Sequence, residues 1–264
     1  MNTSLDPFAS TPVIEVPLVD PPLERVIAQV RFGSVLSIGE MVRGFQESIR
    51  DEYPILDPES VELTVRVNGG IVDRKSKTIW RFSNGDGTWR ASLTDDFIAL
   101  ETLKYTSRDG FVARIERLLI ALREHVHPQF AERIGVRFVD RLHGEDVQRV
   151  PEYVRSEVRG IIGSELAPRV HGTMTQTRFE LPDDEGVLFT RSGLLAIDDT
   201  YDPSAIRPVD HPTWLLDIDA FTERREELDP KAVASRVRML ATRIYAMFRW
   251  SVTDQMLRRF GGAP

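Results

Sequence analysis

The sequence of 264 residues contains no cysteine. Without cysteine the chain can form no disulfide bond, no thiolate nucleophile and no zinc site built on sulfur ligands. The absence fits a reducing compartment, so we expect a cytoplasmic protein. No apolar run approaches the roughly 18 residues that a membrane-spanning helix needs, so we expect no membrane partner.

Motifs of the commonest enzyme classes are also missing. The sequence has no G-x-S-x-G nucleophile elbow, no G-x-x-x-x-G-K-[ST] phosphate loop and no G-x-G-x-x-G dinucleotide motif. Its histidines lack zinc-protease spacing: His125 and His127 fit a helix end, where the dipole favours positive charge, and His211 precedes a proline in a loop. We therefore expect no cofactor, and the sequence favours a non-enzymatic protein over an enzyme.

Basic residues are fewer than acidic residues, and nearly all of them are arginine. Acidic residues outnumber basic ones by 41 to 34, and only four of the basic residues are lysine. An acidic total disfavours nucleic-acid binding, because phosphate contacts dominate such binding. The arginine excess fits the composition of a GC-rich genome. The alternative is that arginines bind carboxylates or phosphates through paired hydrogen bonds.

The sequence does contain two pairs of similar segments, and the members of each pair are 108 residues apart. The segment Arg25–Phe32 resembles Arg133–Val139, and Ile79–Ser83 resembles Val187–Ser192. Each half closes with a long amphipathic helix pattern. We predict an α+β fold of two similar strand-helix-strands-helix halves, with a mostly antiparallel sheet backed by long helices.

The predicted divisions of the chain are three. Residues 1–22 hold five prolines, which fix φ and remove hydrogen-bond donors, so we expect an extended arm that lies over the body or over a partner. The first α+β half is 23–128 and the second is 129–264, and the two halves could form one continuous domain.

In the first half, Asn84–Gly87 predicts a tight hairpin between two strands. A helix with Asp109 as its cap follows. Its predicted buried stripe consists of Phe111, Ile115, Leu118, Leu119 and Leu122.

In the second half, Pro151–Ile162 predicts a helix, and Ser192-Gly193 predicts the turn of a hairpin. The pattern of Trp214–Phe221 is typical of a strand. Asp229-Pro230 predicts the start of the last long helix, with an N-cap followed by proline at the first helical position.

Asp217 and Asp219 are the candidate metal ligands. Positions two apart on a strand point to one face, and two carboxylates on one face can hold a divalent cation. Asp198, Asp199 and Asp202 could supply further ligands. The alternative is a solvated sheet face whose aspartates pair with arginines from neighbouring strands, such as Arg191 or Arg178.

The last long helix carries a basic series in which acidic residues are sparse. Arg236, Arg243 and Arg249 are the candidate residues for binding nucleic acid or an acidic protein partner. The alternative is a solvated helix face.

Several segments together resemble a sporadically distributed family of uncharacterised bacterial proteins of about 260 residues. The resemblance rests on Pro22–Phe32, Phe45-Gln46, Tyr53-Pro54, Ser92–Thr102, Tyr105, Arg133–Val139, Leu216–Asp219 and Thr253-Asp254. It covers almost the whole chain and brings no activity or catalytic residue with it. The patchy distribution implies an accessory role, such as phage defence or a toxin–antitoxin pair.

Three functional hypotheses follow. The first is a non-enzymatic binding protein that acts through a protein partner, and a homodimer is compatible with it. The second is an enzyme that uses a divalent metal ion at Asp217 and Asp219. The third is nucleic-acid binding by the C-terminal basic helix.

Overall fold

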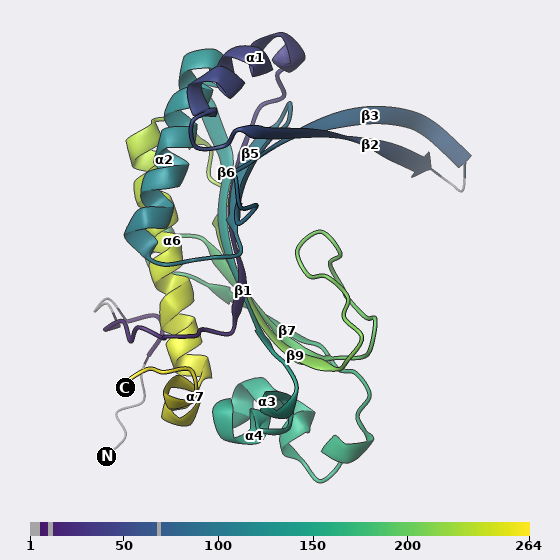
Figure 1. Cartoon of the computed structure of the whole chain (residues 1–264), viewed down its shortest axis with the longest axis vertical. Coiled ribbons are helices and arrows are strands. Elements are labelled where there is room, and N and C mark those ends of the chain that lie inside the picture. Colours follow the sequence, from purple (N-terminus) through teal and green to yellow (C-terminus); the bar gives the residue numbers. More distant parts are fainter. Residues whose placement is uncertain (1–5, 10–12, 68–69) are drawn as a thin grey trace. The chain divides into compact units, whose positions relative to one another are not determined.

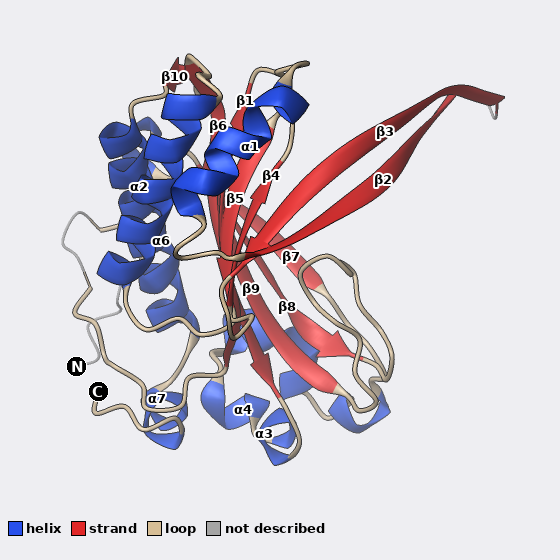
Figure 2. Cartoon of the chain, turned by 45° about the horizontal axis from the view of Figure 1, so that its top comes forward, coloured by secondary structure: helices blue, strands red, loops and turns tan. Residues whose placement is uncertain are grey.

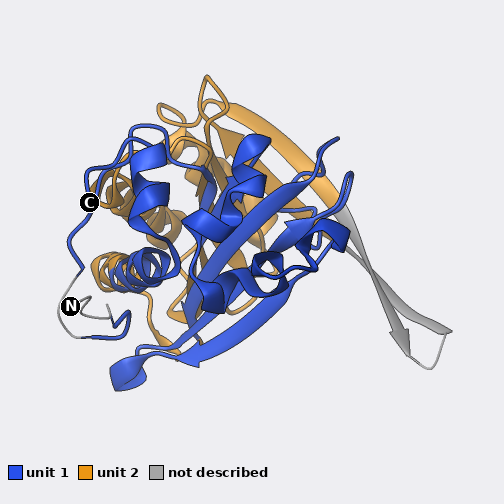
Figure 3. Ribbon diagram, turned by 90° about the horizontal axis from the view of Figure 1, so that it is seen from below, with its two compact units in different colours: residues 1–26, 136–222, 239–264 blue, residues 27–135, 223–238 orange. Residues whose placement is uncertain are grey.

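Two compact units make up the chain, and each draws on separate stretches of the sequence. In the computed structural model, unit 1 comprises residues 1–26, 136–222 and 239–264, and unit 2 comprises residues 27–135 and 223–238 (Figure 3). The structure describes residues 6–9, 13–67 and 70–264, and for residues 61–76 it describes the backbone alone. The predicted boundary at 128/129 follows the chain order and stays a prediction.

The fold is mixed α/β with a large antiparallel sheet, as predicted. Every strand pair whose register is given is antiparallel. The elements, which can be followed in Figure 1, are β1 (Leu23–Phe32), α1 (Ile38–Ile49), β2 (Ile55–Val67), β3 (Gly70–Ser83), β4 (Trp89–Leu93), β5 (Phe97–Thr102), α2 (Arg108–His125), β6 (Phe130–Leu142), α3 (Glu145–Gln148), α4 (Val150–Tyr153), α5 (Ser156–Arg159), β7 (Thr175–Glu180), β8 (Val187–Leu195), β9 (Thr213–Thr222), β10 (Glu226–Glu227), α6 (Pro230–Ser251) and α7 (Asp254–Arg259).

Unit 2 contains the strand order β2-β3-β4-β5-β1-β6, with β10 paired to β6. The predicted hairpin is confirmed: β3 and β4 pair up to Ser83 and Arg90, and Gly87 turns the chain with a φ of 70°. Glycine suits this position because L side chains rarely adopt a positive φ.

Helix α2 packs on α1 and on β5. All five residues of its predicted stripe are buried. The predicted cap is wrong by two residues. Ser107 is the N-cap, because its extended backbone lets its hydroxyl accept a 3.1 Å hydrogen bond from the Gly110 amide, and Asp109 lies in the first turn.

A glycine allows α1 and α2 to approach each other closely. A Cβ atom on Gly44 of α1 would lie 2.7 Å from Nδ1 of His125, the last residue of α2. This separation is far inside van der Waals contact, so a side chain at position 44 would require the His125 ring to shift. The sequence pattern had assigned His125 only to a helix end, which is where it lies.

Unit 1 contains the strand order β1-β6-β9-β8-β7. The predicted helix over Pro151–Ile162 is wrong, because the segment forms the short helices α4 and α5 and a 3₁₀ turn. Two positions interrupt it: Val154 is extended and bridges to Val252, and Gly160 has a φ of 56°.

The predicted turn at Ser192-Gly193 is also wrong, because β8 runs straight through both residues. Gly193 serves close packing instead of a turn. A Cβ atom there would lie 1.9 Å from the carbonyl oxygen of Thr173. The predicted strand at Trp214–Phe221 is confirmed as β9.

Helix α6 begins where it was predicted to begin. The Asp229 carboxylate accepts a 2.9 Å hydrogen bond from the Ala232 amide, and Pro230 is the first helical residue. Among the helices of the described residues, none has both the length and the apolar character that crossing a bilayer requires.

Strands β2 and β3 form a two-stranded ribbon, and only a short part of it pairs with the rest of the sheet. They pair from Ile55↔Ser83 to Val67↔Gly70, whereas β3 pairs with β4 only over Trp80–Ser83. Most of the ribbon therefore has no third strand, and Figure 2 shows it extending beyond β4 and β5. The turn Asn68-Gly69 lies outside the described residues.

Helix α2 allows a matched test of the core. We expect Ile115→Ala to lower the free energy of unfolding by about 2–5 kcal/mol, because Ile115 is fully buried and the change leaves a cavity. The same substitution at Ile120, which is 41% exposed on the same helix, should change stability by about 0.5 kcal/mol or less. Urea denaturation measures both, and equal losses would contradict the assigned face of α2.

Candidate functional site

The candidate site is centred on Asp217 in the middle of β9. Its side chain is completely buried, on the same side of the strand as Thr213 and Leu215, since alternate residues of a strand share a face. A buried carboxylate is costly unless it is paired and hydrogen-bonded. The structure therefore has to supply donors to Asp217.

Arg137 of β6 is the main donor. Its Nε lies 2.9 Å from Oδ1 of Asp217 and its Nη2 lies 3.0 Å from Oδ2, which is the bidentate arrangement that suits a guanidinium and a carboxylate. The remaining nitrogen, Nη1, donates to Asp202 at 2.5 Å. Burial alone would lower the pKa of Arg137, but the hydrogen bonds to Asp217 raise it above its ordinary value.

Two further donors complete the shell of Asp217. Arg191 of β8 stands opposite Asp217 in the strand register, and its Nη1 lies 3.2 Å from Oδ2. The Tyr201 hydroxyl also donates to Oδ2. Burial and the neighbouring Asp217 charge both raise the pKa of Tyr201, so the phenol stays protonated and remains a donor.

We call Arg137, Arg191, Tyr201, Asp202 and Asp217 the charge cluster. It contains two guanidinium groups and two carboxylates, so its formal charge is balanced. Each of its ionic groups is bound to another member. The cluster is therefore built as a mutually satisfied network, and none of its carboxylates lacks a donor.

The connection between β8 and β9, residues 196–212, carries Tyr201 and Asp202 to the cluster. Ala205 and Ile206 of this connection are buried. Its backbone is bound by side chains from two strands: Arg141 Nη1 lies 2.7 Å from the Arg207 carbonyl oxygen, and Arg25 Nη1 lies 3.5 Å from that of Ser204. These contacts fix the loop that positions the phenol and the second carboxylate.

Asp140 is a buried carboxyl near the cluster with unusual electrostatics. Burial, together with repulsion from Asp217, raises the pKa of Asp140 to about 7. It lies three residues beyond Arg137 on β6 and is 6% exposed. Sequence reasoning missed it because a lone aspartate in a strand pattern gives no sign of its burial.

The structure places the two predicted metal ligands differently. Asp217 meets Arg191, as the alternative predicted, and also Arg137 and Tyr201, but its side chain is fully buried and does not lie on a solvated face. Asp219 lies two residues further along β9, opposite Phe189. Asp202, a predicted additional ligand, belongs to the cluster but binds Arg137. Within the described part of the chain, no group of three or more metal-ligating side chains occurs, and the metal site stays a prediction.

The three predicted binding arginines of α6 each lie beside a carboxylate. Arg243 forms a bidentate pair with Glu185 at 2.6 and 3.1 Å. Arg236 lies 3.6 Å from Glu226, and Arg249 lies 3.7 Å from Asp254. Intramolecular pairing therefore takes up much of the positive charge that a nucleic acid or acidic partner would meet.

The described part of the proline-rich arm lies on unit 1 itself. The Val16 amide donates to the Tyr245 hydroxyl at 2.7 Å, and the Val19 amide donates to the Phe260 carbonyl at 3.0 Å. Phe8 packs against Phe179, with ring centroids 5.5 Å apart. Of the two predicted positions for the arm, these contacts correspond to the one over the body.

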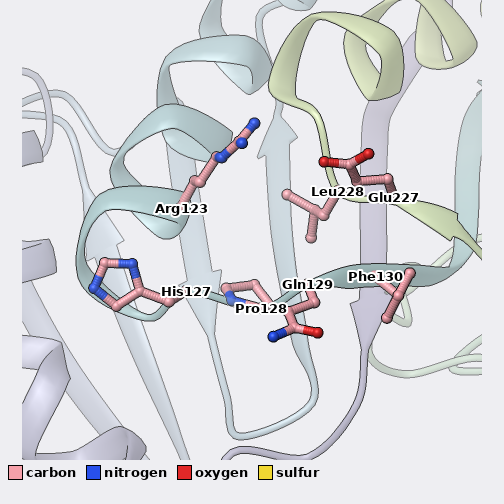
Figure 4. Close-up of a pocket in the computed structure, with 7 residues that line it drawn as sticks. All are labelled: Arg123, His127, Pro128, Gln129, Phe130, Glu227 and Leu228. Carbon is pink, nitrogen blue, oxygen red and sulfur yellow. The ribbon is translucent and has the colours of Figure 1, made fainter.

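A separate hollow of about 450 Å³ occurs in unit 2, between the end of α2 and the short strand β10. Figure 4 shows Arg123 and His127 on one side and Glu227 with Leu228 on the other. Arg123 is already bound to Asp229 at 3.3 Å. The hollow thus presents charges of both signs and no dominant chemistry.

A comparison with models of known protein families and with curated proteins finds no match to this chain.

A matched pair of substitutions tests the cluster. We expect Asp217→Asn to lower the free energy of unfolding by about 3–5 kcal/mol, because it leaves the guanidinium of Arg137 buried with part of its charge unpaired. Asp219→Asn on the same strand should cost much less, since Asp219 is only half-buried. Thermal and urea unfolding with and without Mg²⁺ or Mn²⁺ measures both. A metal-dependent rise in the wild-type Tm that both variants lose would support the metal prediction instead.

Asp140 gives the structure a distinctive pH dependence. Its pKa is higher in the folded protein than the ordinary value of 3.8, so the folded state binds more protons between about pH 4 and pH 7. The contribution of Asp140 to the free energy of unfolding is therefore complete below about pH 4 and is lost as the pH rises through 7. Its size is about 1.4 kcal/mol per unit of pKa shift. We expect Asp140→Asn to remove that loss. The free energy of unfolding of both proteins at pH 5 and pH 8 checks this. An equal change with pH in wild type and variant would rule the shift out.

Proposed function

We propose that this chain is a non-enzymatic binding protein that acts through a protein partner. The observation that carries the proposal is the β2–β3 ribbon, which pairs over Ile55–Val67 and Gly70–Ser83 but meets a third strand only at Trp80–Ser83. A two-stranded ribbon is at best marginally stable in water by itself. A ribbon of this length gains stability when a partner covers it, which is how a binding arm behaves.

The base of the ribbon supplies a suitable surface. Ile55 is 49% exposed and Leu56 is 38% exposed, and both begin the edge strand β2. Because they are consecutive on the strand, Ile55 and Leu56 lie on opposite faces of the ribbon. Exposed apolar side chains favour a protein partner over a nucleic acid, which is bound mainly through positive charge.

The edge of β2 is protected against uncontrolled strand pairing. Pro58 lies inside β2, opposite Trp80, and has no backbone N–H to donate to another strand. Proline and charged residues on an edge strand are common devices against aggregation. The ribbon is therefore suited to a specific partner that contacts its base and faces.

The charge cluster supports a scaffold in preference to a reaction centre. Both oxygens of Asp217 and three nitrogens of Arg137 are used in contacts within the cluster. The metal-enzyme and nucleic-acid hypotheses remain predictions, and neither gains an observation from this geometry.

The duplicated, helix-backed platform belongs to the same proposal. From β1 outwards the order is β5, β4, β3, β2, and from β6 outwards it is β9, β8, β7, so β2 has no counterpart in the second half. Each half ends in a long helix, α2 or α6. This order supports duplication, and in it β8 occupies the place that corresponds to β4. The offset of 108 residues in the sequence pairs β8 with β3 instead. Membership of the resembled bacterial family, with an accessory role in defence or a toxin–antitoxin pair, is also part of the proposal.

Shortening the ribbon tests the proposal. We design a variant in which residues 60–78 are replaced by Asn-Gly, a sequence that favours a two-residue hairpin turn, so that Glu59 and Ile79 remain paired. The removed part has no third strand, but it includes Lys77, which forms ion pairs with Asp95 and Asp96. Because partly exposed ion pairs contribute about 1 kcal/mol or less each, we expect the Tm to stay within a few degrees of wild type. We expect the affinity for the purified native partner to fall at least tenfold.

A point variant and its control accompany the truncation. Ile55→Lys with Leu56→Lys should weaken the same complex, while Leu103→Lys, at a 47% exposed position of the same unit, should not. The partner is identified by co-purification from the source cells and the affinity is then measured with both purified proteins. Unchanged affinity in the truncated variant would overturn the proposal.

A further inference from the structure

A pair of histidines lies at the ends of two neighbouring strands of unit 1. His143 follows β6 directly, and His211 lies two residues before β9. The two strand ends are joined by a 3.0 Å hydrogen bond from Arg141 Nε to Thr213 Oγ1. This bond brings together two histidines that are 68 residues apart in the sequence.

The two imidazole rings face each other through nitrogen atoms. Nδ1 of His143 lies 3.0 Å from Nε2 of His211, and the ring centroids are 5.3 Å apart. Two nitrogens bound at about 2.0–2.1 Å to a tetrahedral metal ion lie roughly 3.3 Å apart. Small rotations of the two rings would therefore place both nitrogens on one ion.

Asp210 sets the protonation of His211. Its Oδ1 lies 2.8 Å from Nδ1 of His211, so this nitrogen carries the proton and donates it to the carboxylate. Nε2 of His211 is then left with a lone pair on the side of His143. A carboxylate that holds the far nitrogen of a histidine is the usual outer partner of a metal-binding histidine.

The surroundings of His143 favour its neutral form. Burial, then the positive charge of Arg141, lowers the pKa of His143, against a smaller opposite effect of Glu24. A neutral imidazole is the form that binds a metal ion. When both rings are neutral and Nδ1 of His211 donates to Asp210, the 3.0 Å contact is a hydrogen bond from Nδ1 of His143 to Nε2 of His211. Metal binding through Nδ1 of His143 would require the other neutral tautomer of this ring, with its proton on Nε2.

We propose that Nδ1 of His143 and Nε2 of His211 bind one divalent transition-metal ion of the kind that favours imidazole, such as Zn²⁺ or Ni²⁺, with Asp210 as the outer-shell carboxylate. The described residues offer no third protein ligand there, so water fills the remaining positions. Imidazole ligands favour zinc, nickel and copper over magnesium and calcium. This site is separate from the predicted carboxylate site at Asp217 and Asp219, and it involves a different class of ion.

Isothermal titration of the full chain with ZnCl₂ and NiCl₂ at pH 7.5 tests the proposal. We expect one ion per chain, and at least tenfold weaker binding in both His143→Ala and His211→Ala. Asp210→Asn keeps both ligands but loses the carboxylate, so binding should weaken about 10–100-fold. His171→Ala removes an exposed histidine of the same unit and should bind as wild type does.

A spectroscopic measurement separates a metal site from a mere change in folding. X-ray absorption of the zinc-loaded protein should show two imidazole ligands with oxygen atoms in the other positions, and His143→Ala should lose one of them. MgCl₂ should produce no binding heat that depends on the two histidines. The proposal is overturned if the wild type binds no ion, or if its binding is unchanged when either histidine is replaced.

Discussion

The buried carboxylate of Asp217 is the constraint around which unit 1 is organised. A charge with no exposure to water needs hydrogen-bond donors that are rigidly held. Asp217 of β9 receives them from Arg137 of β6, Arg191 of β8 and Tyr201 of the 196–212 connection. Asp202 of the same connection binds the remaining nitrogen of Arg137. Removing one partner would leave another buried and unpaired. The cluster thus specifies which strands are neighbours and how the long connection folds over them.

The same connection links the cluster to the histidine pair. Tyr201 and Asp202 lie near its start, and Asp210 and His211 lie near its end. Between them, Arg141 holds the Arg207 carbonyl and Thr213. An ion bound between His143 and His211 would therefore tie the end of this connection to β6, while the charge cluster ties its beginning to β6 and β9. The β2–β3 ribbon belongs to unit 2, whereas the charge cluster and the histidine pair both lie in unit 1.

Local patterns predicted much of the fold, because they depend on neighbours in the sequence. The stripe of α2, the Asn84–Gly87 hairpin and the Asp229 cap all arise from spacing or turn chemistry within a few residues. Apart from the cap of α2, failures came where a distant contact decides the outcome. Gly193 is used for packing against Thr173, and Val154 leaves the helix to pair with Val252. The pairing of Asp217 with Arg191 was open to prediction because their strands adjoin, whereas Arg137, 80 residues away, was not.

A double-mutant cycle between Arg137 and Asp217 tests most directly whether the cluster is a structural ion pair. Arg137→Met leaves Asp217 with Arg191 and Tyr201, Asp217→Leu leaves Arg137 with Asp202, and the double variant removes both members of the bidentate pair. The account predicts that the double variant is more stable than at least one single variant, with a coupling energy of about 1–3 kcal/mol or more. Additive losses in free energy of unfolding would contradict it.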